Sequence, residues 1–162
     1  MKVLHLARRF VGSLGRSGPS AEDQAWARSF LLPGESALWS RLSNPDKRHS
    51  VTVAREVARQ LGDRVTRPVL AAALMHDVGK VPSGLGTFGR VGATVVRTVV
   101  GRDRPQGRIG SYLRHDEHGA HMLEVAGSDV LTVTWAAEHH LPPDRWSLEP
   151  RVAAALKAAD DD

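Results

Sequence analysis

The chain has 162 residues, which fits one ordinary domain and is long enough to bury roughly 70% of the surface that an unfolded chain exposes. Apolar residues make up 41% of the sequence and charged residues 25%, which excludes the composition typical of disorder. The net charge of +4 suits an anionic ligand, but the positive charges are scattered, which argues against a dedicated nucleic-acid surface. The absence of cysteine excludes disulfides, thiolate metal sites and cysteine nucleophiles.

The N-terminal segment has Arg8 and Arg9 where a signal peptide would have its apolar core. The longest unbroken apolar run, residues 69–75, is far shorter than the roughly 20 residues that span a bilayer. We therefore expect a cytoplasmic protein with a basic leader and no transmembrane segment.

Apolar residues recur with the helical period along most of the chain, and no stretch alternates with period two, so the sequence predicts an all-α fold. Ser20 predicts the start of a helix over 21–32, and Pro33-Gly34 separates it from a short helix near 35–42. Residues 1–43 are expected to form a basic leader and a helical extension. Residues 44–162 are expected to form a metal-binding domain, and the two together one compact unit.

The sequence from residue 44 onwards predicts several further helices. Asn44-Pro45 is expected to cap and start a helix that Gly62 closes after Leu61. A helix after Pro68 should end at Gly79, with His76 and Asp77 in its last turn. The remaining helices are expected near 87–100, over 109–113, over 115–125, from the cap Ser128 to about Leu141, and after Pro150. The apolar face of the 87–100 segment is compatible with core packing, with a homo-oligomer or with a membrane surface.

Histidine and aspartate occupy positions where these helices predict inward apolar residues. His49 precedes Val53 by four residues, His139 follows Trp135 by four, and Asp160 follows Leu156 by four. A buried carboxylate costs several kcal/mol unless a cation pairs with it. Imidazoles and carboxylates together are ligands of divalent transition metals, and helical bundles build such sites between facing helices.

Each residue also has a simpler interpretation. An inward histidine is commonly a hydrogen-bonded core residue, and Asp160 is close enough to the end of the chain to belong to a frayed acidic tail. His139 and His140 would also suit a helix C-terminus, which favours positive charge. We interpret His118, His121 and His5 as structural or surface residues. The order and spacing of the remaining residues favour the metal site.

The segment ALMHDVGK, residues 73–80, resembles the signature of the HD-domain metal phosphohydrolases. The resemblance extends from about residue 44 to residue 160. The family has a histidine on an earlier helix, matched by His49, then the adjacent pair, matched by His76 and Asp77, and a distant aspartate, matched by Asp160.

The segment HDEHGAHML, which begins at His115, resembles the histidine-containing helix of the HD-GYP branch, and His139-His140 matches the paired histidines of that branch. The Gly-Tyr-Pro signature is absent, which puts hydrolysis of cyclic dinucleotides in doubt. Pro45 stands where a glutamate would precede His49 by four residues, so a third metal is not expected.

The resemblance implies an HD-domain helical bundle with a short N-terminal helical extension and a two-metal centre. One ion would be held by His49, His76, Asp77 and Asp160, and Asp77 would bridge to a second ion held by His115, His139 and His140. Iron or manganese is expected, with zinc, cobalt and nickel as alternatives.

The implied activity is metal-dependent hydrolysis of a phosphorylated small molecule, whether a phosphomonoester, a nucleotide or a phosphodiester, by a metal-activated water. Asp77 and Lys80 are the expected catalytic residues. Lys80 would meet a phosphate oxygen, although a lysine after a helix end is also explained by the helix dipole. A non-catalytic ligand- or metal-sensing module and an HD-fold di-iron oxygenase remain alternatives.

Overall fold

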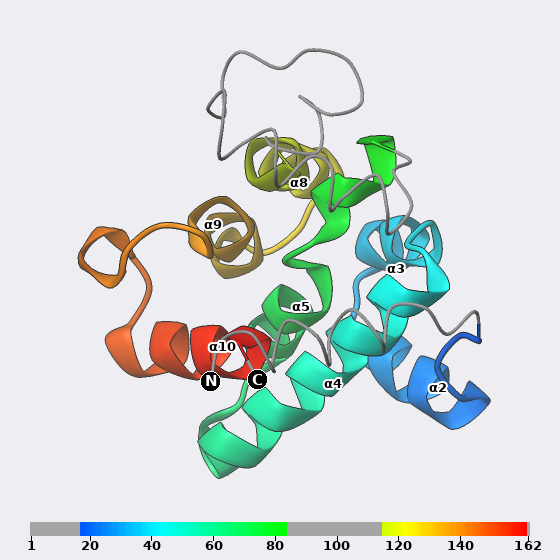
Figure 1. The fold of residues 1–162 in the computed structure, drawn as a ribbon, viewed down its shortest axis with the longest axis horizontal. Coiled ribbons are helices and arrows are strands. Elements are labelled where there is room, and N and C mark those ends of the chain that lie inside the picture. Colours follow the sequence, from blue (N-terminus) through cyan, green and yellow to red (C-terminus); the bar gives the residue numbers. More distant parts are fainter. Residues whose placement is uncertain (1–16, 84–114, 162) are drawn as a thin grey trace.

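The computed structural model describes residues 17–83 and 115–161 (Figure 1). Within these ranges the regular structure is helical and contains no strand, which confirms the predicted all-α fold. The expected helices near 87–100 and over 109–113 lie outside the described residues. The described α-helices are α2 (Ala21–Ser29), α3 (Pro33–Ser40), α4 (Asn44–Leu61), α5 (Arg67–Met75), α8 (His115–Val125), α9 (Val130–Glu138) and α10 (Pro150–Asp161). Short 3-10 turns are η1 (Gly62–Arg64), η2 (Val78–Ser83) and η3 (Pro143–Arg145).

The predicted helix starts are correct to within two residues, but two of the predicted caps are wrong. Ser43, and not Asn44, caps α4, because its side chain accepts a hydrogen bond from the backbone N–H of Asp46. Asp129, and not Ser128, caps α9. In both places two neighbouring residues have cap-forming side chains. The backbone conformation selects the first of the two at α4 and the second at α9. Ser20 caps α2 as predicted.

Helix α2 ends at Ser29 and not at residue 32. Helices α5 and α9 also end earlier than the sequence predicts, and both end at a histidine. Helix α5 ends at Met75, so His76 is its C-cap and Asp77 lies in the following turn. Helix α9 ends at Glu138 with His139 as its C-cap, not near Leu141. In each case the histidine ring binds a carbonyl of the last helical turn, which a continued helix would have used for its own backbone hydrogen bond.

Helix α5 lies at the centre of the fold, with α3, α4 and α9 packed against it (Figure 1). Its residues from Val69 to Met75 are all buried, which is the pattern of a core helix and not of a surface helix. Helix α10 packs on α4, and α8 packs on α9 and on η2. The chain that follows α5 therefore emerges in the interior of the bundle, where five helices approach one another.

Side chains of the N-terminal extension belong to the same core. Trp39 of α3 is fully buried and donates through Nε1 to Ser50 Oγ of α4 at 3.0 Å. Arg55 of α4 binds Asp23 of α2 at 2.7 Å. A domain boundary after residue 43 stays a prediction. None of the described helices is both long and apolar enough to cross a bilayer.

Candidate metal centre

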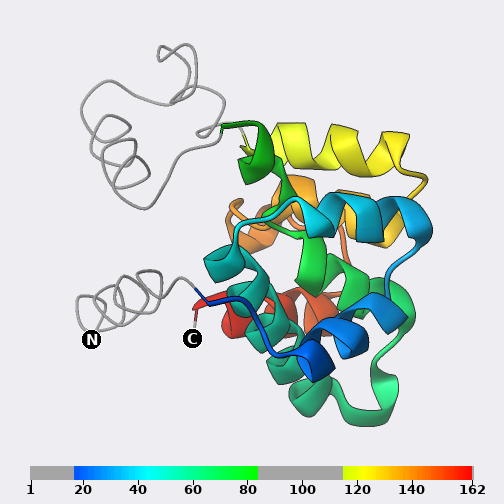
Figure 2. The same cartoon turned by 90° about the vertical axis from the view of Figure 1, so that its right-hand side faces the viewer.

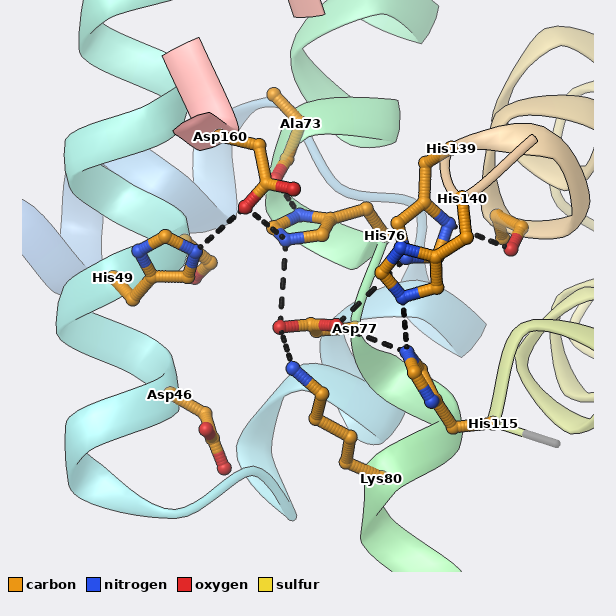
Figure 3. Close-up of polar contacts among 12 residues, drawn as sticks. Asp46, His49, Ala73, His76, Asp77, Lys80, His115, His139, His140 and Asp160 are labelled. Carbon is orange, nitrogen blue, oxygen red and sulfur yellow. Dashed lines mark hydrogen bonds and ion pairs between the residues drawn. The ribbon is translucent and has the colours of Figure 1, made fainter. Parts of the chain in front are cut away.

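The residues that the sequence predicts as metal ligands converge at one place in the bundle (Figure 3). They come from five different helices or the turns that follow them, and His49 and Asp160 are 111 residues apart in sequence. The contributors are His49 of α4, His76 and Asp77 after α5, His115 in the first described turn of α8, His139 and His140 after α9, and Asp160 in the last turn of α10.

One group of these residues surrounds His76. Its Nε2 atom lies 3.4 Å from Asp77 Oδ2 and 3.5 Å from Asp160 Oδ1. His49 Nε2 lies 3.1 Å from the same oxygen of Asp160. Ligand atoms of His49, His76 and Asp77, one from each residue, lie within 4.8 Å of one another. Three donors to one ion require such a spacing.

The other group consists of three histidines. His115 Nε2 lies 3.0 Å from His140 Nε2, and ligand atoms of His115, His139 and His140 also fit within 4.8 Å. Asp77 Oδ1 faces this group, at 3.5 Å from His115 Nε2 and 3.9 Å from His139 Nε2. Asp77 therefore lies between the two groups and turns one carboxylate oxygen towards each.

Backbone carbonyls fix the tautomers of the two most deeply buried histidines. His76 Nδ1 donates to Ala73 O at 2.9 Å, and His139 Nδ1 donates to Ala136 O at 3.0 Å. A carbonyl can only accept, so Nδ1 carries a proton in both rings. The Nε2 atoms of both rings are buried and make no hydrogen bond with the described residues. Both Nε2 atoms face carboxylates, an arrangement that becomes favourable when a metal ion lies between them or when the ring is protonated.

The charges of the centre support the same interpretation. Burial by itself would lower the pKa of His76, but the facing carboxylates of Asp77 and Asp160 raise it to about 10. Burial would raise the pKa of Asp77, yet Lys80 and His76 hold it well below its usual range. The pKa of Asp160 is lowered against burial by His76 and His49. Two ionised carboxylates in the interior thus attract a positive charge, which a proton on His76 or a metal ion can supply.

His139 is neutral at physiological pH. Burial, followed by the charge on His76, lowers its pKa to about 4. The C-terminal ends of α5 and α9 both point into the centre, since His76 and His139 are their C-caps. Helix C-termini carry partial negative charge, so they add to the attraction for cations. The donor set of neutral imidazoles and carboxylates therefore fits divalent transition metals.

Lys80 lies beside the centre, and its Nζ contacts Asp77 Oδ2. Its side chain is 15% exposed, so it is the member of this contact that reaches the solvent. His118 and His121 are exposed on α8, as the sequence predicts, and His121 pairs with Glu124 at 3.7 Å. His5 lies outside the described residues.

Asp46 is a buried acidic residue that the sequence predictions do not include. This aspartate lies one turn before His49 on α4 (Figure 3). It accepts a hydrogen bond from Ser43 Oγ at 2.6 Å. The three-residue spacing, which places both side chains on one face of the helix, was the available signal.

The HD domain family model matches residues 47–161, a range that includes all the residues that converge at the centre. No match was found among curated proteins or among solved structures. The family match covers more than half of the chain, and the helical fold agrees with it. The chain therefore belongs to the HD-domain family, as the signature around His76 and Asp77 predicts.

Proposed function

We propose that this HD domain is a metal-dependent phosphohydrolase with a two-metal centre. The observation that carries the proposal is the position of Asp77, whose Oδ2 faces His76 and whose Oδ1 faces His115 and His139. A carboxylate with one oxygen towards each of two donor groups is the arrangement expected of a bridging ligand. Membership of the HD-domain family supports the reaction class.

Two sets of residues would hold the ions. His49, His76, Asp77 and Asp160 form the first set, and His115, His139, His140 and Asp77 form the second. Imidazoles equal the carboxylates in number in the first set and outnumber them in the second, which favours transition metals over magnesium or calcium. We propose iron or manganese as the natural metal, with zinc, cobalt and nickel as alternatives.

Two bound ions would lower the pKa of a shared water towards neutrality and offset the charge that develops on phosphoryl oxygens. The protein supplies the rest. Asp77 and Asp160 stay ionised, and the carbonyls of Ala73 and Ala136 keep the rings of His76 and His139 in the ligand tautomer. Lys80, partly exposed beside Asp77, would bind a phosphate oxygen as a point charge.

The test is a comparison of metal content and turnover between the wild-type chain, His76→Ala and His121→Ala. Each protein is purified without a metal-chelating tag, loaded with Mn(II) or Fe(II), and assayed on a nitrophenyl phosphomonoester and a bis-nitrophenyl diester. We expect His76→Ala to lose metal and activity, and the exposed His121→Ala to keep both. Activity that survives His76→Ala would contradict the proposal.

Two other results would favour the alternatives. Metal binding with no turnover on either ester, together with stabilisation by a nucleotide, would indicate a sensing module. Oxygen consumption with a mixed-valent iron signal and no hydrolysis would indicate an oxygenase.

A further inference from the structure

Helix α8 supplies a single residue, His115, to the second group of proposed ligands. The other members, His139 and His140, follow α9, and Asp77 follows α5. The position of α8 relative to the turn after α5 therefore decides whether His115 reaches the other three residues.

At this place the turn after α5 and helix α8 approach each other closely through two glycines. A Cβ atom at Gly79 would lie 1.8 Å from His115 O and 2.6 Å from Gly119 N. His115 O and Gly119 N are the acceptor and donor positions of one turn of α8. A Cβ atom at Gly119 would lie 3.1 Å from Gly79 N. The backbone of η2 thus lies directly on the first described turn of α8, at a distance that only glycine permits.

Space, and not backbone conformation, requires glycine at position 79, and a Cβ atom at position 119 would be in tight contact. Among the described residues the glycines with positive φ are Gly62 and Gly127, so neither Gly79 nor Gly119 has a conformation that other residues avoid. Glycine is also a poor helix former compared with alanine, yet Gly119 lies inside α8. Close approach to Gly79 is the feature of the structure that accounts for it.

A similar contact holds the opposite end of the helix. A Cβ atom at Gly34, in the first turn of α3, would lie 2.4 Å from Ala126 O, just after the end of α8. Figure 2 shows η2 at one end of α8 and the start of α3 near its other end. Since α8 has 11 residues, the two contacts are separated by roughly 16 Å. The Gly34 contact is therefore a natural control, because it restrains the same helix far from the metal centre.

We propose that the contact between Gly79 and Gly119 positions His115 for the second metal ion, so that these glycines determine whether the centre holds two ions or one. The inference rests on the proposed two-metal function. A side chain at position 79 would have to displace the carbonyl of His115 by more than 1 Å to reach an ordinary contact distance. Metal–ligand distances tolerate deviations of only about 0.2 Å. The ring of His115 would then leave the ligand geometry.

The first group of ligands is expected to tolerate the same displacement. His76 is held by Ala73 O inside the buried helix α5, and His49 and Asp160 lie on α4 and α10, which pack on each other. None of these contacts involves α8. The displacement should therefore weaken one ion selectively and leave the other in place.

The experiment compares the wild-type chain with Gly79→Ala, Gly119→Ala, Gly34→Ala and His115→Ala. Each metal-free protein is titrated with Mn(II), bound manganese per chain is measured by equilibrium dialysis and elemental analysis, and electron paramagnetic resonance distinguishes coupled from isolated ions. Thermal unfolding of the metal-free proteins measures how much each substitution destabilises the fold.

We expect two ions and a coupled signal for the wild type and for Gly34→Ala, even if Gly34→Ala unfolds at a lower temperature. Gly79→Ala should match His115→Ala, with one ion and the signal of an isolated Mn(II). Gly119→Ala, which needs a smaller displacement, should bind the second ion about 10- to 100-fold more weakly and the first ion normally.

Wild-type affinity for both ions in Gly79→Ala would overturn the inference, as would loss of the second ion in Gly34→Ala. If Gly79→Ala does not fold, Gly119→Ala is the deciding variant. An unchanged affinity of Gly119→Ala for the second ion, together with a higher unfolding temperature, then overturns the inference. A wild-type chain that binds fewer than two ions contradicts the two-metal function itself, and the inference falls with it.

Discussion

Replacement of His139 by leucine tests whether the buried histidines serve metal binding or the stability of the fold. His139 is 0% exposed, packs against Trp135, and has a buried Nε2 atom with no hydrogen bond to the described residues. Its pKa is lowered to about 4, so the ring is neutral at physiological pH and leucine removes no charge.

The expected effect on the metal-free protein is small. Removal of the buried Nε2 atom gains about 1–3 kcal/mol, but removal of Nδ1 takes away the hydrogen-bond donor of Ala136 O and costs a comparable amount. The two effects offset each other to within about 1 kcal/mol, so the unfolding temperature of a chain of this length should change by no more than about 2–4 °C.

The substitution should clearly lower the stability when metal is present. A ligand at 100 times its dissociation constant stabilises the folded state by about 2.7 kcal/mol, and His139→Leu removes this contribution for the second ion. The assay is thermal unfolding of both proteins with a chelator and with Mn(II). The control is Ser50→Ala, which removes a buried hydroxyl that is hydrogen bonded to Trp39 and should destabilise the protein in both conditions. If His139→Leu lowers the unfolding temperature with the chelator as much as with Mn(II), His139 is a structural core residue and the reasoning is wrong.

Three further predictions follow from the same structure. Asp77→Asn should lower metal content below that of either Asp160→Asn or His115→Ala, because Asp77 faces both donor groups. The measurement is elemental analysis after Mn(II) loading, and an Asp77→Asn protein that keeps as much metal as the other two would contradict the prediction. Lys80→Ala should raise KM for a phosphoester about 10-fold or more, as expected for the loss of a charged contact of about 1.5–3 kcal/mol, while metal content stays constant. Loss of metal would instead indicate that Lys80 serves to position Asp77. Gly62→Ala should destabilise the fold by about 1 kcal/mol in urea unfolding, because its φ of 52° suits glycine at the end of α4, and metal binding should be unchanged.

Local signals in the sequence predict the helices well. Ser20, Pro45 and Gly62 mark helix ends that the structure has at the same places or one residue away. The predicted caps at Asn44 and Ser128 are wrong by one residue, because a neighbouring side chain of the same capping ability takes the role. Local patterns have little power to separate two adjacent candidates of equal chemistry.

The sequence by itself also determined which side chains point inward. The four-residue steps that include His49, His139 and Asp160 place these polar groups on apolar helix faces, and the HD signature identifies His76 and Asp77 as their neighbours. Such a pattern depends only on the geometry of single helices, which short stretches of sequence specify.

Only the tertiary structure decided how these side chains meet. One carboxylate oxygen of Asp77 faces His76, and the other faces His115 and His139. This arrangement depends on where α5, α8 and α9 pack, and so does the contact between Gly79 and Gly119. These positions result from contacts between surfaces far apart in the chain, and no local pattern encodes them. The sequence therefore determined the chemistry that is available, and packing determined its geometry.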